Sequence, residues 1–71
     1  MNIPLGRIGE IINSDCKERY IKVEEDFENT GGYLIFYSAT LDFVYAYDDW
    51  TPKADLQAYF EEAGWQIEWL D

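Results

Sequence analysis

The sequence predicts a small α+β domain in which one helix packs across an antiparallel β-sheet. Several segments alternate apolar and polar residues with the two-residue period of a strand, and one segment in the C-terminal half repeats its apolar residues at three- and four-residue spacing. Short polar links separate the alternating segments, which predicts a three-strand meander with flanking strands. The chain of 71 residues is expected to form one domain, residues 1–71.

The N-terminal part predicts two strands joined by a turn. Residues 5–12 alternate weakly and are expected to form a short strand, and residues 13–19 are polar and typical of a turn. Residues 20–27 place Ile21 and Val23 on one face and charged side chains on the other. This pattern predicts a strand with one buried face.

Two further strands are predicted in the middle of the chain. Residues 28–32 contain an asparagine and paired glycines, which supply positive φ in a turn without strain. Residues 33–39 are apolar on both faces, so we expect them to form the central strand. Residues 40–42 make a tight connection to a strand at 43–50.

The strand predicted at 43–50 has two different faces. One face carries Phe43, Tyr45 and Tyr47, and the other carries Val44, Ala46 and Asp48.

The following segment predicts a helix. Thr51 suits the N-cap, Pro52 the first helical position, and Asp55 a first turn in which the helix dipole favours an anion. The predicted apolar stripe consists of Leu56, Tyr59, Phe60 and Ala63.

A glycine is expected to end this helix. Gly64 fits the left-handed position after the last turn, and Trp65 is then placed to pack back on Phe60. Residues 66–70 alternate again and predict a last strand, which could pair beside the first strand or beside the meander.

The residue types exclude most catalytic chemistry. The chain has no histidine, the commonest general base near neutral pH and the commonest metal ligand. The single cysteine, Cys16, has no histidine to form a thiolate pair and is expected to be an unpaired thiol in a loop or a buried position. The acidic runs at 24–29 and 48–49 lack the ligand spacing of a calcium loop. We therefore expect no catalytic residues, no metal, no cofactor and no enzymatic activity.

The charge balance restricts the partners. The chain has 15 acidic and five basic residues, which gives a formal net charge of −10 at pH 7. This charge disfavours direct binding to nucleic acid or to anionic membranes and favours a basic protein partner. The longest apolar run, residues 33–37, is far below the roughly 20 residues that a membrane span needs. With no secretory signal pattern at the N-terminus, the expected location is the cytoplasm.

An acidic–aromatic run supplies the candidate partner-binding site. Tyrosine and tryptophan dominate binding energy in protein interfaces, and aspartates beside them can pair with arginine or lysine of a partner. Glu61 and Glu62 lie late in the helix, where the dipole disfavours them, and could share a face with these aspartates. The candidate residues are Tyr45, Tyr47, Asp48, Asp49, Trp50, Glu61 and Glu62.

The segments GGYLI, YDDW and GWQIEW, within residues 28–69, resemble by type the small acidic immunity proteins of bacterial toxin systems, including contact-dependent and other polymorphic toxins. Immunity proteins differ in fold, so the resemblance implies a function and not a topology. It implies a tight stoichiometric complex with a cognate toxin domain, often a basic nuclease, whose active site or a neighbouring surface is blocked. It carries over no catalytic residue, because such proteins have none.

The leading hypothesis is thus a non-enzymatic bacterial immunity or inhibitor protein that neutralises a basic toxin. One alternative is a nucleic-acid mimic of the anti-restriction or anti-CRISPR type, which requires carboxylates in two rows at about phosphate spacing. Another is a general interaction module, which could form a homodimer through its exposed rings. A compact acidic patch around Asp48 would favour the inhibitor over the mimic.

Overall fold

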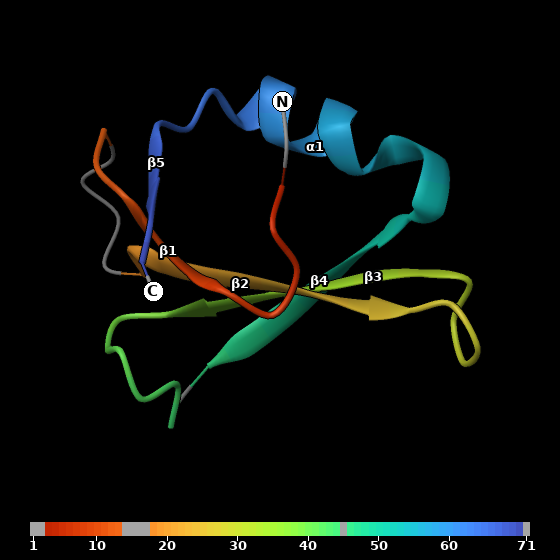
Figure 1. Cartoon of the computed structure of the whole chain (residues 1–71), viewed down its shortest axis with the longest axis horizontal. Helices are drawn as coiled ribbons and strands as arrows, with labels where there is room; N and C mark the ends of the chain where they lie inside the picture. The colour runs from red at the N-terminus through yellow and green to blue at the C-terminus, as the bar shows by residue number, and fades with distance from the viewer. Residues whose placement is uncertain (1–2, 14–17, 45, 71) are drawn as a thin grey trace.

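The computed structural model describes residues 3–13, 18–44 and 46–70 and has an antiparallel sheet with one α-helix on one side of it (Figure 1). The sheet order is β4-β3-β2-β1-β5. The elements are β1 (Ile8–Ile11), β2 (Tyr20–Asp26), β3 (Gly32–Ser38), β4 (Tyr47–Pro52), the 3-10 turn η1 (Lys53–Asp55), α1 (Leu56–Ala63) and β5 (Ile67–Trp69).

The predicted fold class is confirmed. β2, β3 and β4 form the predicted meander, and each of its strand pairs is antiparallel. The last strand pairs with the first: β5 lies beside β1, with Gly9 opposite Trp69. The prediction of the central strand is wrong, because β2 and not β3 occupies the middle of the sheet. Both are interior strands, and β3 is apolar on both faces because aromatic side chains also gather on the side away from the helix.

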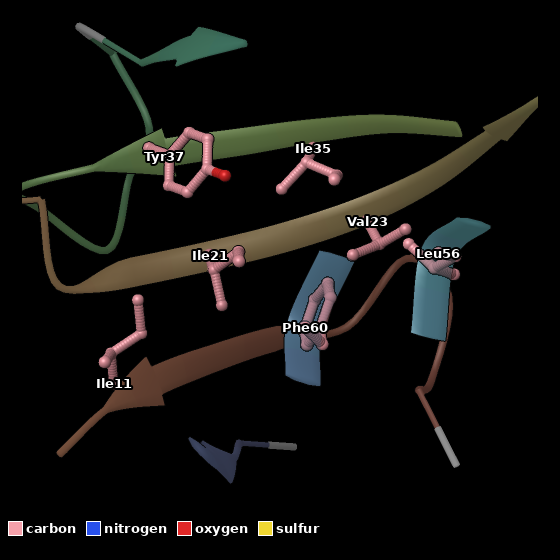
Figure 2. Packing of buried hydrophobic residues seen from close by; sticks show 7 residues of the cluster. All are labelled: Ile11, Ile21, Val23, Ile35, Tyr37, Leu56 and Phe60. Carbon is pink, nitrogen blue, oxygen red and sulfur yellow. The ribbon is translucent and has the colours of Figure 1, made fainter. Parts of the chain in front are cut away.

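The core lies between the sheet and α1 (Figure 2). Ile21 and Val23 in β2 and Ile35 in β3 are fully buried, as the two-residue alternation predicts. Phe60 of α1 is 1% exposed and covers them. Complete burial of a side chain of this size contributes about 1.5–3 kcal/mol, so these few residues hold the helix on the sheet. The buried hydrophobic residues of the described chain are Ile11, Ile21, Val23, Ile35, Tyr37, Leu56 and Phe60.

The strand predicted at 43–50 begins later than its pattern suggests. β4 starts at Tyr47, and Phe43 has a φ of 55°, which breaks an extended conformation. Asp42 holds the preceding loop, since its Oδ1 accepts hydrogen bonds from Thr40 Oγ1 at 2.6 Å and from the Val44 N–H at 3.1 Å. These bonds, the first of them the stronger cause, lower the pKa of Asp42. Side-chain bonds of this kind compete with strand formation, and here they prevail over the strand-like residue types.

The predicted start of the helix is also wrong. Thr51 is 3% exposed and lies in β4 opposite Tyr33, and Pro52 has the extended φ of −60° and ψ of 154°. Pairing with β3 therefore extends β4 over the expected N-cap. The α-helix begins at Leu56, after the 3-10 turn, and Asp55 occupies its N-cap without a side-chain capping bond.

The predicted end of the helix is confirmed. Gly64 has a φ of 67°, and its N–H donates to the carbonyls of Phe60 and Glu61. The Trp65 ring packs edge-on against Phe60, with ring centroids 5.4 Å apart. Ala63 is exposed, so the buried stripe of the helix is narrower than its spacing predicts.

Candidate functional site: an acidic–aromatic groove

Strand β4 forms one edge of the sheet and carries the predicted acidic–aromatic run. Its residues from Tyr47 to Trp50 are all exposed, and Tyr47 keeps 54% of its surface. An unpaired edge normally invites another strand, and charged side chains are a common protection against this. Asp49 acts locally in this way, because its Oδ1 accepts a hydrogen bond of 2.8 Å from the Trp50 N–H.

A groove of about 360 Å³ lies between this edge and the C-terminal end of α1. Among the described residues that line it, three are acidic, four are aromatic and none is basic. We call it the acidic–aromatic groove, and its lining consists of Ile11, Glu18, Tyr37, Tyr47, Asp48, Asp49, Tyr59 and Trp65.

The aromatic side chains form connected walls. Tyr37 and Tyr47, opposite each other on β3 and β4, stack with centroids 5.3 Å apart and an interplanar angle of 29°. Trp65 meets Tyr37 at 5.9 Å and Tyr59 at 6.1 Å, both edge to face. Aromatic pairs in these arrangements contribute about 0.5–1.5 kcal/mol each beyond the area they bury, so the walls are preformed.

A chain of hydroxyl groups connects the core to the groove. Tyr59 donates a hydrogen bond of 3.0 Å to Oδ2 of Asp49. The hydroxyls of Tyr37 and Tyr59 are also bonded to each other. Since Tyr59 gives its one hydroxyl hydrogen to Asp49, Tyr37 is the donor in that second bond.

Both phenols are held in the neutral form. Burial is the largest cause that raises the pKa of Tyr37 above its ordinary value of 10.0, and its bond to Tyr59 raises it further. Burial also raises the pKa of Tyr59; the bond from Tyr37 opposes this rise, and Asp49 adds to it. At neutral pH Tyr37 therefore donates to Tyr59 and Tyr59 donates to Asp49, and neither phenol loses its proton.

Two other acidic residues line the groove. Within the described part of the chain, neither the Glu18 nor the Asp48 side chain forms a hydrogen bond or an ion pair. Glu18 can therefore accept hydrogen bonds from a ligand in the groove without first losing an internal partner. The Asp48 side chain alternates with those of Tyr47 and Asp49, so it lies at the outer edge, on the sheet face away from α1. Asp49 differs, because each of its oxygens already accepts one hydrogen bond from the protein.

The structure separates Trp50 from the groove. Successive strand residues point to opposite faces, so Trp50 lies on the sheet face away from α1. Its ring N–H donates to Thr30 Oγ1 at 2.8 Å, and a Cβ added to Gly32 would come within 2.8 Å of the ring nitrogen. Trp50 thus covers the start of β3 and remains 43% exposed.

The two helix glutamates lie in different places. Glu62 lines a neighbouring hollow together with Asp55 and Tyr59, so it extends the acidic surface along the helix. Glu61 lies beside Gln57, whose Nε2 is 3.5 Å from its Oε1, and it lines neither hollow. Tyr45, the remaining candidate, and Cys16 lie outside the described residues.

Five groove residues lie outside the predicted site. Ile11 is in β1 and Tyr37 in β3. Tyr59 is in α1, where the sequence predicts it in the apolar stripe, Trp65 follows the helix, and Glu18 precedes β2. Their convergence depends on long-range pairing. The one available signal is the meander itself, which places β3 against β4 and thereby Tyr37 near Tyr47.

The described residues contain no cluster of three or more side chains able to hold a metal ion. Among them no helix has the length and apolar character needed to cross a membrane. Comparison of the chain with protein-family models, with curated proteins and with solved structures finds no match.

Proposed function

We propose that the protein is a non-enzymatic immunity or inhibitor protein that binds and neutralises a cognate basic toxin domain of the nuclease type. The observation that carries the proposal is the acidic–aromatic groove, in which exposed carboxylates and tyrosine rings lie together without a basic side chain among the described lining residues. Interfaces of high affinity commonly centre on aromatic residues and on well-placed charge pairs.

The net charge of −10 supports the same partner class. A strongly acidic surface attracts a basic protein over long range and raises its association rate, and the effect weakens with ionic strength. Asp48 and Asp49 lie at the exposed edge, where an approaching cationic surface meets them first.

The grouping of these carboxylates favours an inhibitor over a nucleic-acid mimic. Glu18, Asp48 and Asp49 line one compact groove, whereas a mimic needs carboxylates in two rows that follow phosphate spacing. Like charges on β4 also disfavour a homodimer made by pairing two copies of this edge strand.

The test uses the product of a toxin gene adjacent to the gene of this protein. The purified toxin domain is expected to bind with one-to-one stoichiometry in calorimetry and to lose its nuclease activity in the complex. Association should slow as salt rises from low to physiological concentration. A toxin domain that neither binds nor loses activity at equimolar protein would contradict the proposal.

A further inference from the structure

We infer that the acidic–aromatic groove takes up an arginine side chain of the partner. The inference rests on the proposed function, because it names the group that the basic partner inserts into the same surface. The geometry of the rings, the carboxylates that can accept further hydrogen bonds and the size of the groove support this inference.

The rings offer flat surfaces for a planar cation. Tyr47 stacks on Tyr37 with one face and keeps 54% of its own surface exposed. Trp65 and Tyr59 contact each other edge to face in the wall of the groove, with centroids 6.1 Å apart. A guanidinium group stacks on such faces and gains a cation–π attraction, which is stronger where water is excluded.

The carboxylates offer acceptors for a donor fork. The Glu18 side chain has no hydrogen bond or ion pair with described residues. Asp49 is held in position by Tyr59, and each of its oxygens keeps a second acceptor site beside the one hydrogen bond it accepts. Arginine presents five N–H donors in one plane and can bond more than one carboxylate oxygen at once. Lysine concentrates its charge on one ammonium group and lacks the planar surface that stacks on rings, so this groove favours arginine.

The volume fits a single side chain. At about 360 Å³ the groove lies near the lower end of the range of about 300–1,000 Å³ for ligand pockets. The described lining residues include no lysine or arginine.

The test is an NMR titration of the whole chain with N-acetyl-arginine amide, N-acetyl-citrulline amide and the corresponding lysine derivative. Citrulline matches arginine in size and lacks its charge. We expect saturable shifts of the Trp65 ring and of the Tyr59 and Tyr47 side chains with the arginine probe. The lysine probe should bind more weakly, and the citrulline probe should cause no saturable shift.

Matched variants localise the effect. Asp49→Asn and Glu18→Gln should each raise the dissociation constant of the arginine probe by about threefold, as expected for a partly exposed charge pair. Glu28→Gln removes the same charge at the exposed turn beyond β2 and should leave the constant unchanged. Equal shifts by citrulline, equal affinity for lysine, shifts scattered over the surface, or an equal effect of Glu28→Gln would overturn the inference.

The outcomes separate this inference from the proposed function. A groove that binds the arginine probe while the adjacent toxin domain does not bind the protein would overturn the proposed function alone. A toxin domain that binds Asp49→Asn/Glu18→Gln as tightly as wild type would overturn the arginine site alone.

Discussion

The hydroxyl of Tyr59 in α1 donates a hydrogen bond of 3.0 Å to Oδ2 of Asp49 in β4. The helix therefore fixes an acidic side chain of the exposed edge strand. Through its second bond, to Tyr37, the same hydroxyl connects Asp49 to the buried face of β3. This part of the candidate site is thus built onto the packing contact between helix and sheet.

Tyr59→Phe should lower the free energy of unfolding by about 1 kcal/mol, because Tyr37 loses the acceptor of its hydrogen bond and Asp49 loses a donor. Urea denaturation measures the change. Tyr33→Phe is the matched control, since Tyr33 keeps its edge contact with Phe27 at 5.0 Å and its hydroxyl has no hydrogen bond within the described chain. Equal losses in the two variants would contradict a specific role of the Tyr59 hydroxyl.

Stability should fall in alkaline solution. The pKa values of Tyr37 and Tyr59 are raised in the folded chain, so it retains protons that the unfolded chain releases near the ordinary value of 10.0. Their contribution to stability is therefore complete below this pH and is lost as the pH rises above it.

The urea midpoint followed from neutral pH into the alkaline range measures this dependence. Tyr37→Phe removes the more strongly shifted phenol and should flatten the decline above the ordinary tyrosine pKa. A midpoint that falls with the same slope in Tyr37→Phe and in wild type would contradict the assignment to these two groups.

Gly64 should be sensitive to substitution for backbone reasons alone. Its φ of 67° disfavours residues with a Cβ, yet an added Cβ meets no atom within 4 Å. Gly64→Ala should therefore lower the free energy of unfolding by about 1 kcal/mol, and Gly64→Asn by less, because asparagine tolerates the left-handed conformation. Thermal or urea unfolding checks the order glycine, asparagine, alanine, and equal stability of all three would contradict it.

Substitutions of Trp50 and Tyr47 should distinguish a loss of stability from a loss of affinity for the partner. Trp50→Phe removes the ring N–H that donates to Thr30 at 2.8 Å, so it should cost about 1 kcal/mol of stability and leave the affinity for a basic toxin domain unchanged. Tyr47→Ala should instead weaken that complex by more than about 1 kcal/mol, the scale that marks important interface residues. Calorimetry of both variants with the toxin domain measures this, and an equal loss of affinity in Trp50→Phe would place the opposite sheet face in the interface.

The sequence predicts the strands best where burial determines the pattern. Ile21 and Val23 alternate with charged residues because only one face of that part of β2 is buried, and Gly64 marks the helix end because of its φ. The start of β4 was not predictable from residue types, since Phe43 and Val44 favour strands but follow the hydrogen-bonded Asp42. Here the side-chain hydrogen bonds of Asp42 outweigh the strand preference of the residues that follow it.

The site was predictable only in part for a similar reason. Tyr47, Asp48 and Asp49 are neighbours in the sequence and remain together on β4. Tyr47 and Asp49 point toward the side of α1, whereas Asp48 and Trp50 point to the other sheet face, because a strand alternates its side chains. Tyr37 and Trp65 reach the groove through strand pairing and helix packing, which a single sequence does not specify residue by residue.

The most direct measurement compares wild type, Asp49→Asn and Glu28→Gln in their affinity for the adjacent toxin domain at low and at physiological salt. The two variants lose the same charge, so only its position differs. Attraction through the groove predicts that Asp49→Asn weakens the complex by more than about 1 kcal/mol and reduces its salt dependence, while Glu28→Gln changes the affinity much less. Equal affinities of the two variants at both salt concentrations would contradict it.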